Sequence, residues 1–360
     1  MGYMNGGGVE SVVMNYYKHI DRTRVQFDFI ICEGSTLAPR DAIESLGGRV
    51  YMVPPYSHAI GYQRALALLF RERGWAIVHS HMNALSVLPL RMAKKAGIPV
   101  RIAHSHSSNG GGRGELVKDA MKTVLRRFSR RYPTDLLACS NLAGDWLFGS
   151  GSGYGVLPNA VDVAAFAPEE GLRTEARRAL GVSDSTFVVG HIGRMAPQKN
   201  HSHLLETFME VLAAEPDSQL LLAGEGPLFG EVRAKAKSMG ISGKVRFLGQ
   251  REDSAALYQA FDVFCLPSVY EGLPMVGVEC QASGTPILAS DAVTREAAMT
   301  SLMEFESLSS SPQTWARHLL AMRGKTFAPG DAEGLATFDV VVTAKKLENY
   351  YFDCLKGVER

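Results

Sequence analysis

Short apolar segments alternate with longer segments of helical periodicity along nearly the whole chain, and this alternation limits the possible folds most strongly. Within the apolar segments polar residues do not alternate regularly, so the strands they predict are buried on both faces. Strands of this kind, separated by helices, form parallel sheets in α/β proteins. The predicted strands form two series: 26–32, 49–54, 76–81, 100–106 and 136–140, then 186–193, 219–224, 245–249, 263–268 and 286–290. Two such series predict two doubly wound, Rossmann-like domains.

The domain junction is predicted where a Gly/Ser-rich stretch, 149–155, is followed by Pro158 and Asn159. We therefore expect an N-terminal domain of residues 1–157 and a C-terminal domain of residues 158–337. The last segment, 338–360, has the pattern of one amphipathic helix, and we expect it to pack back onto the N-terminal domain.

The start of the chain departs from the usual doubly wound pattern. Such a domain normally begins with a strand that leads into its first ligand loop. Here the loop Asn5-Gly6-Gly7-Gly8 comes after only four residues, fewer than the roughly five or six of an ordinary strand. We expect the first strand to be missing from the N-terminal sheet, and the coding region ahead of Met1 to encode it in frame.

Composition excludes several classes of protein. The formal net charge of +1 argues against a nucleic-acid binder that works through overall charge. Five scattered cysteines fit a reducing compartment better than a disulfide framework. No apolar run reaches transmembrane length and no signal peptide opens the chain. We therefore expect a cytoplasmic protein whose membrane contact, if it has one, is peripheral.

Two carboxylates, Glu271 and Glu279, follow the predicted strand 263–268 and flank the start of a helix. In open α/β sheets ligands bind at the carboxyl ends of the strands, and a helix start offers free N–H groups to anionic oxygens. Carboxylates accept hydrogen bonds from paired hydroxyls. The pattern fits a site for phosphate or hydroxyl oxygens. A single glutamate here would more simply be an acidic residue at a helix start.

A second candidate site contains Arg194, at the end of a predicted strand, and Lys199, just before a helix. A guanidinium fork beside an ammonium can stabilise negative charge on phosphate oxygens, although a random pair of this kind is more often two solvated basic residues on a loop. The segment Gly224-Glu225-Gly226-Pro227 fails the spacing of a dinucleotide fingerprint, so we interpret it as a turn. The sequence has no Asp-x-Asp to hold a divalent cation, so we expect no metal and no other cofactor.

Two His-x-His motifs, at 79–81 and 104–106, fall near the carboxyl ends of predicted strands. Residues two apart on a strand face the same side, so each motif points two imidazoles together. Two such pairs could ligate zinc or iron. No carboxylate-rich motif joins them, and we interpret His79 and His104 as buried or polar-edge residues.

These motifs occur in a set order along nearly the whole chain. The set contains Gly7-Gly8-Val9-Glu10, Ile77-Val78-His79-Ser80-His81, Pro158-Asn159-Ala160-Val161-Asp162, Gly193-Arg194 with Lys199-Asn200, Gly224-Glu225-Gly226-Pro227, Phe247-Leu248-Gly249 and Pro267-Ser268-Val269-Tyr270-Glu271-Gly272-Leu273-Pro274. In this order the chain resembles the retaining glycosyltransferases of the GT-B fold, family 4, and among them the bacterial capsule and exopolysaccharide enzymes.

The resemblance implies two domains facing a cleft, with the acceptor on the N-terminal domain and the nucleotide sugar on the C-terminal one. It places Glu279 at the ribose, Glu271 at the transferred sugar, and His106, with His104 as the other candidate, against the donor sugar. Arg194 and Lys199 would be catalytic. The remaining donor-binding residues would be Gly7, Gly8, Gly272, Leu273, Pro274, Met275 and Val276. The donor would be a UDP sugar and the acceptor a glycan or a lipid-linked glycan.

A basic amphipathic stretch, 116–132, carries six lysines and arginines beside an apolar stripe. Such a helix can rest on an anionic membrane surface, and an ordinary solvated helix face would look the same.

Three other functions fit parts of the pattern. A GT-B nucleotide-sugar epimerase would convert the donor without an acceptor. A hydrolase would use a metal held by the histidine pairs. A truncated, inactive remnant would bind the sugar nucleotide without turnover.

Overall fold

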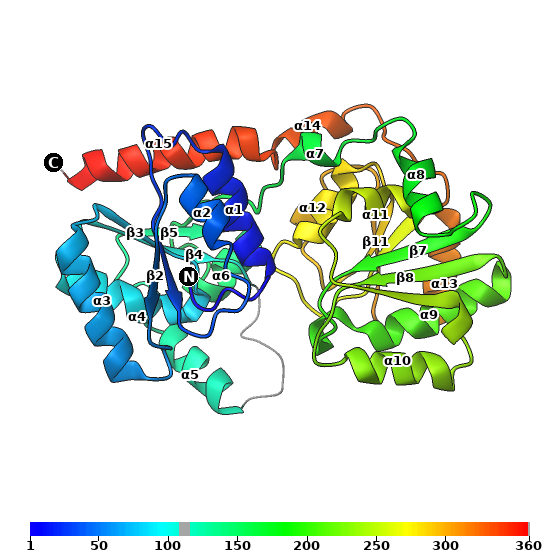
Figure 1. The fold of residues 1–360 in the computed structure, drawn as a ribbon, viewed down its shortest axis with the longest axis horizontal. Helices are drawn as coiled ribbons and strands as arrows, with labels where there is room; N and C mark the ends of the chain where they lie inside the picture. Colours follow the sequence, from blue (N-terminus) through cyan, green and yellow to red (C-terminus); the bar gives the residue numbers. More distant parts are fainter. Residues whose placement is uncertain (108–115, 359–360) are drawn as a thin grey trace. The chain divides into compact units, whose positions relative to one another are not determined.

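The computed structural model describes residues 1–107 and 116–358, which form two compact units. One unit comprises Met1–Ala160 with Asp339–Arg360, and the other comprises Val161–Phe338. Figure 1 shows a β-sheet core flanked by helices in each unit. Among the described residues, no helix combines the length and apolar composition needed to span a bilayer.

The second unit contains one parallel sheet of six strands in the order β12-β11-β10-β7-β8-β9. This is the doubly wound order of a Rossmann domain, in which the first strand, β7, lies at the point where the order reverses. The strands are β7 (Phe187–Ile192), β8 (Ser218–Ala223), β9 (Val245–Gly249), β10 (Val263–Leu266), β11 (Ile287–Ser290) and β12 (Met303–Glu306). Ligand-binding loops are therefore expected at the carboxyl ends of β7 and β10.

Helices cover both faces of this sheet. On one face α9 (His201–Ala214), α10 (Phe229–Ser238) and α13 (Pro312–Ala321) pack on the strands around the buried Trp315. The other helices of the unit are α7 (Val163–Phe166), α8 (Leu172–Ala179), α11 (Ser254–Ala260), α12 (Met275–Ala282) and α14 (Asp331–Ala336). Strands that are buried on both faces explain the unbroken apolar segments of the sequence.

The first unit has two separate parallel sheets among its described residues. One pairs β1 (Phe29–Cys32) with β2 (Val50–Val53), and the other has the order β3-β4-β5-β6. Its strands are β3 (Ile77–Ser80), β4 (Val100–Ser105), β5 (Asp135–Ala138) and β6 (Gly155–Val156). Within the described part of the chain no strand precedes α1, as expected from the few residues ahead of the glycine loop.

The helices of the first unit are α1 (Gly8–His19), α2 (Arg40–Ser45), α3 (Ala59–Arg73), α4 (Val87–Lys95), α5 (Leu116–Arg126), α6 (Asn141–Phe148) and α15 (Val340–Val358). The terminal helix α15 packs against α1 through a buried stripe that includes Leu347 and Tyr351. This contact joins the end of the chain to the first unit.

The helix predicted over 116–132 ends earlier, at Arg126. Beyond it, Phe128 N donates to Leu125 O and Ser129 N to Arg126 O, which makes tight turns, and the Ser129 hydroxyl donates to Leu147 O. Pro133 then prevents a return to helix. The segment 108–115 and the side chains of 116–120, including the Lys118 counted in the basic stretch, lie outside the described residues.

Candidate active site

An ion pair joins the loops that follow β7 and β10. The Lys199 ammonium lies 2.7 Å from a Glu271 carboxylate oxygen, and Gln198 Nε2 donates to the other oxygen at 3.1 Å. Gln198 also donates from Nε2 to Tyr270 O, and its own carbonyl accepts from Val269 N at 2.8 Å. Glu271 is only 7% exposed. A largely buried carboxylate held by an ammonium and an amide is a fixed group at the sheet edge.

Glu279 lies one turn inside α12, and its carboxylate accepts a hydrogen bond from the Tyr258 hydroxyl at 2.9 Å. Burial raises the pKa of this carboxyl, while the bond from Tyr258 and the positive charge of Lys199 oppose the rise. Lys199 therefore influences both glutamates electrostatically. The two glutamates and Lys199 form one group of charges at the carboxyl edge of the second unit's sheet.

The start of α12 leaves backbone donors without a helical acceptor. Its first hydrogen bonds run from Gly277 N and Val278 N to Pro274 O. The amides of Met275 and Val276 therefore belong to the first turn, where N–H groups point out of the helix toward a ligand position. Ahead of them Gly272 and Leu273 are buried in the loop that carries Glu271.

Two glycines fix the loop that carries Arg194. Gly224 and Gly226 have φ of +127° and +158°, and a Cβ on them would lie 2.2 Å from Gly193 O and 2.5 Å from Met195 O. Met195 N also donates to Glu225 O at 2.9 Å. The turn after β8 thus packs backbone to backbone against the loop after β7. Arg194 itself is exposed, and among the described residues it makes no ion pair.

In the first unit, the glycine loop wraps around a carboxylate of its own chain. The Glu10 carboxylate accepts from Asn5 N at 3.0 Å, Gly6 N at 2.6 Å and Gly7 N at 3.0 Å. Gly8 then opens α1. The loop therefore has an anion-binding form, and an external phosphate would compete with Glu10 for the donors of residues 5–7.

Four imidazoles stand in two hydrogen-bonded pairs on β3 and β4 and directly after them, and those of His104 and His106 are buried while those of His79 and His81 are half-buried. His79 Nε2 lies 3.1 Å from His104 Nδ1, and His81 Nδ1 lies 2.9 Å from His106 Nε2. Burial, reinforced in three of them by neighbouring imidazoles, lowers the pKa of all four. At neutral pH they are uncharged.

The partners of His106 define its tautomer. The Asn159 Oδ1 atom, 3.1 Å from His106 Nδ1, can only accept, so Nδ1 carries the proton. His106 Nε2 then accepts from His81 Nδ1. Because both ring nitrogens have partners, a sugar hydroxyl would have to replace one of them. His104 Nε2 is buried without a partner among the described residues.

The structure brings Lys199, Glu271 and Glu279 together with the start of α12, and it places Arg194 on the same sheet edge. Gly7, Gly8 and His106 lie in the first unit. Sequence reasoning assigned no role to Gln198, Tyr258, Asn159 or Glu10. Glu10 and Asn159 lie within recognised motifs and Gln198 adjoins Lys199, whereas Tyr258 carries no local signal because it meets Glu279 from another helix.

Comparisons with known proteins match both halves. Residues 7–160 match the glycosyl transferase 4-like domain, and residues 186–322 match the glycosyl transferases group 1 family. HepE of Anabaena, solved in complex with UDP-glucose, superimposes with a TM-score of 0.80 at 19% identity over 98% of both chains. This likeness confirms the GT-B fold.

Two curated relatives match most of the chain. A galactosyltransferase of Escherichia coli, named for UDP-Gal and alpha-D-GlcNAc-diphosphoundecaprenol, is 26% identical over 79% of this chain and 76% of its own. EpsF of Bacillus subtilis (strain 168), which is named as a glycosyltransferase, is 37% identical over 87% of this chain and 84% of its own length. The chain is therefore a glycosyltransferase and belongs to the glycosyl transferases group 1 family.

Proposed function

We propose that this glycosyltransferase takes a sugar from a UDP sugar, retains the configuration of the anomeric carbon, and passes the sugar to a glycan or lipid-linked glycan. The observation that carries the proposal is the group formed by Lys199, Glu271 and Glu279 beside the open first turn of α12. A sugar diphosphate offers hydroxyls for the carboxylates and anionic oxygens for the ammonium and the amides.

The ribose is assigned to Glu279. One oxygen of its carboxylate accepts a hydrogen bond from the Tyr258 hydroxyl, and the other oxygen can accept one from a ribose hydroxyl. Burial raises the pKa of this carboxyl, so hydrogen bonds from the hydroxyls would favour its charged form. Tyr258 then serves as a positioning residue.

The diphosphate is assigned to Arg194, Lys199 and the amides of Met275 and Val276. The bond between the anomeric carbon and the phosphate oxygen breaks, and negative charge grows on the leaving diphosphate. Fixed positive groups stabilise that charge more strongly in a site shielded from water. Lys199, held 2.7 Å from Glu271, is already in position before the donor arrives.

The acceptor attacks from the face that the diphosphate leaves. A new bond forms between the acceptor oxygen and the anomeric carbon, and the acceptor proton passes to a phosphate oxygen of the leaving group. Glu271, at the sugar, would stabilise positive charge on the anomeric centre. The first unit is proposed to bind the acceptor, with Gly7, Gly8 and His106 completing the donor site.

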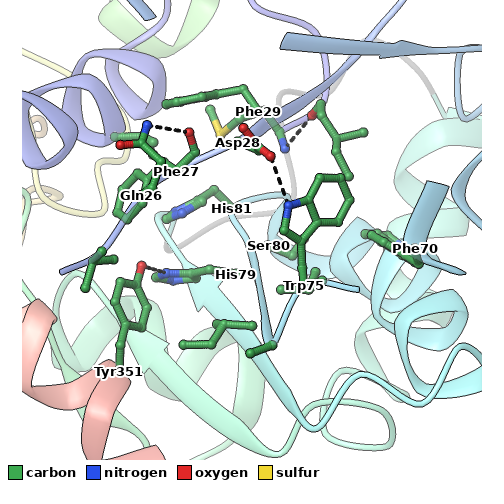
Figure 2. Close-up of a pocket in the computed structure, with 18 of the residues that line it drawn as sticks. Gln26, Phe27, Asp28, Phe29, Phe70, Trp75, His79, Ser80, His81 and Tyr351 are labelled. Carbon is green, nitrogen blue, oxygen red and sulfur yellow. Dashed lines mark hydrogen bonds between the residues drawn. The ribbon is translucent and has the colours of Figure 1, made fainter. Parts of the chain in front are cut away.

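No divalent cation is needed in this scheme, because Arg194 and Lys199 supply the charge that a metal would otherwise give. The described residues do include three imidazoles, of His79, His81 and His104, whose nitrogens lie within 4.8 Å of one another. His79 bonds to Tyr351 (Figure 2) and to His104, and His81 bonds to His106, so we assign these imidazoles a structural role.

A lipid-linked acceptor is supported by the galactosyltransferase of Escherichia coli, which is named for alpha-D-GlcNAc-diphosphoundecaprenol. We further propose a role in capsule or exopolysaccharide synthesis. The epimerase alternative finds less support, because these relatives are named as glycosyltransferases.

The test is incubation of the purified chain with single UDP sugars and either water or GlcNAc-diphosphoundecaprenol. We expect a new glycoside whose anomeric configuration, determined by NMR, equals that of the donor. An inverted product would contradict retention, and conversion of the donor sugar without any acceptor would favour the epimerase.

A further inference from the structure

Three histidines of the second unit hold buried ring nitrogens that lack a hydrogen-bond partner among the described residues. These atoms are Nε2 of His191, both nitrogens of His201, and Nε2 of His203. A buried polar atom without a partner costs stability, so such atoms are rare in folded proteins and need an explanation. His191 and His201 are of most interest, because they stand at either end of the loop that carries Lys199.

The sheet determines which nitrogen of His191 carries the proton. His191 lies on β7 next to β10, and its Nδ1 is 2.8 Å from the backbone oxygen of Cys265. A carbonyl oxygen can only accept, so Nδ1 is the donor and carries the hydrogen. Burial lowers the pKa of this imidazole well below its usual value, so the ring is neutral near pH 7. Nε2 therefore presents a bare lone pair.

That lone pair lies beside the side chain of Lys199. A Cβ on Gly193 would lie 3.1 Å from His191 Nε2 and 3.3 Å from Lys199 Cε. Because Gly193 has no side chain, the imidazole and the lysine chain share the space next to its Cα. After burial, the positive charge of Lys199 also contributes to the lowered pKa of His191 and of His201. The unused acceptor is therefore close to the end of the lysine side chain.

His201 supports the ring of His191 from the start of α9. The two rings meet edge to face, with their centroids 4.7 Å apart. His201 is buried, and it is joined to Lys199 by Asn200, whose φ of +52° is a left-handed conformation that asparagine tolerates. This one residue turns the chain from Lys199 into α9. The turn and the ring contact keep the three side chains in a fixed arrangement.

The ammonium of Lys199 has more donors than Glu271 uses. It has three N–H groups, and the Glu271 carboxylate accepts from it at 2.7 Å. The proposed function gives Glu271 to the transferred sugar and Lys199 to the leaving diphosphate. A sugar hydroxyl that donates to Glu271 weakens the hold of this carboxylate on the ammonium. The ammonium is largely buried, so it then needs a second acceptor to stay in place.

We propose that His191 is a positioning residue for this transferase, whose Nε2 accepts a hydrogen bond from the Lys199 ammonium when the donor sugar engages Glu271. This role rests on the proposed function, in which Lys199 faces the diphosphate. A neutral imidazole holds the ammonium without cancelling the charge that the diphosphate needs. In this scheme His191 does not contact the donor and acts only through Lys199.

The competing role for His191 is structural, with the imidazole filling the core and tying β7 to β10 through Cys265. An apolar side chain would fill that space without burying an unpaired lone pair. The two roles use different atoms of the ring. The structural role uses Nδ1 and the positioning role uses Nε2, so substitutions that preserve one nitrogen position at a time separate them.

The experiment replaces these two positions in turn. The amide of His191→Asn can keep a donor to Cys265 O but does not reach the position of Nε2. His191→Gln is one bond longer and can return an acceptor to that position. His203→Asn is the matched control, because His203 also has an unpartnered Nε2 but packs on Trp315. Melting temperature, UDP affinity by calorimetry, and kcat for sugar transfer are measured for each variant.

We expect His191→Asn to lower kcat roughly tenfold, as for one lost hydrogen bond to a charged group, and to change UDP affinity less than about threefold. UDP carries no sugar to engage Glu271, so its binding does not depend on His191. His191→Gln should recover most of the rate, and His203→Asn should keep all of it. Added to Lys199→Met, His191→Asn should lower the rate no further. If His191→Asn does not fold, His191→Phe takes its place, since it keeps a ring against His201.

Three results would overturn the role of His191 alone. They are a full rate in folded His191→Asn while Lys199→Met is impaired, an equal loss of rate in His191→Asn and His191→Gln, and a further loss when His191→Asn is added to Lys199→Met. An unimpaired Lys199→Met would instead overturn the proposed role of Lys199 at the diphosphate, and the role of His191 with it.

Discussion

Lys199 is the residue on which the proposed site depends most, because its ammonium pairs with Glu271 and also influences the pKa of Glu279. Both members of the ion pair are largely buried. A buried ion pair adds little net stability to the fold. Removing one partner nevertheless destabilises the fold, because the other charge is then buried without compensation. Stability and catalysis can therefore be separated at this pair by single and double substitution.

We expect Lys199→Met to lower both the melting temperature and the transfer rate, because Glu271 loses its partner and the diphosphate loses a cation. The double variant Lys199→Met/Glu271→Gln should recover most of the melting temperature. Its transfer should stay roughly 100-fold or more below that of the unchanged enzyme. Calorimetric melting and initial rates check this, and recovery of transfer in the double variant would contradict a catalytic role.

The buried histidines predict a loss of stability in acid. Burial lowers the pKa of His79 to about 3 and of His106 to about 4, whereas exposed imidazoles titrate near 6.5. The unfolded chain therefore binds more protons than the folded chain below about pH 6.5, and stability falls as the pH drops toward 4. For His106 alone the loss at pH 5 is about 2 kcal/mol.

The check is the melting temperature of the first unit between pH 7.5 and pH 5. His106→Gln should flatten this dependence, and His58→Gln, at an exposed position, should not. An equal acid dependence in all three proteins would show that the buried imidazoles do not cause it.

At the scale of single elements, the loops after β7, β8 and β10 build the candidate site together. Gly224 and Gly226 allow the turn after β8 to contact the backbone of residues 193–195. The sequence predicted a turn there, because the spacing failed the dinucleotide pattern. It could not predict which backbone the turn contacts, since that depends on the packing of β8 beside β7.

Gly226→Ala should destabilise the second unit by about 2 kcal/mol or more and reduce transfer, because its Cβ would meet Met195 O at 2.5 Å and move the loop that carries Arg194. Gly230→Ala is the matched control, since nothing lies within 4 Å of its Cβ in α10. It should be neutral or slightly stabilising. Equal effects at the two positions, measured by thermal melting and initial rate, would refute this account of the loop.

The surface of α5 and the turns after it provides a second prediction at this scale. Met121, Val124 and Phe128 are exposed there, with Arg127 and Arg130 exposed beside them. Exposed apolar side chains among cations suit an anionic lipid surface.

We expect the enzyme to float with vesicles that contain anionic lipid at low salt and to detach at high salt. Arg127→Glu/Arg130→Glu should weaken binding at least tenfold, from about 1 kcal/mol for each lost cation. Arg91→Glu, on α4, should not. If the unchanged enzyme does not bind the vesicles at low salt, the membrane proposal is wrong and this surface is an ordinary solvated one.

The sequence predicted the fold more completely than the site. Uninterrupted apolar segments identified the inner strands, because strands buried on both faces need such segments. It did not predict β6, of two residues, or β12, whose sequence Met303-Glu304-Phe305-Glu306 carries two acidic side chains. Both segments become strands because they pair with a neighbouring strand, β6 with β5 and β12 with β11.

At the scale of the whole molecule, a parallel sheet such as that of the second unit places loops that are distant in sequence at one edge. Glu271 and Lys199 are 72 residues apart and form an ion pair because β7 and β10 are neighbours at the reversal of strand order. The bond between Tyr258 and Glu279 likewise needs two helices packed on the same sheet. Such contacts arise from tertiary packing, so local sequence patterns identify the charged residues but not their partners.

The central claim is that the second unit binds a nucleoside diphosphate at this edge without a metal. Titration calorimetry of UDP into the purified enzyme, with EDTA present, tests it most directly. Glu279→Ala removes the proposed ribose acceptor, and Glu231→Ala, exposed on α10, is the matched control. Circular dichroism confirms that each variant is folded.

We expect UDP to bind in EDTA, Glu279→Ala to weaken that binding by about 2 kcal/mol or more, a factor of ~30, and Glu231→Ala to leave it unchanged. Binding that appears only when Mg²⁺ or Mn²⁺ is added, or an unchanged affinity in folded Glu279→Ala, would contradict the account.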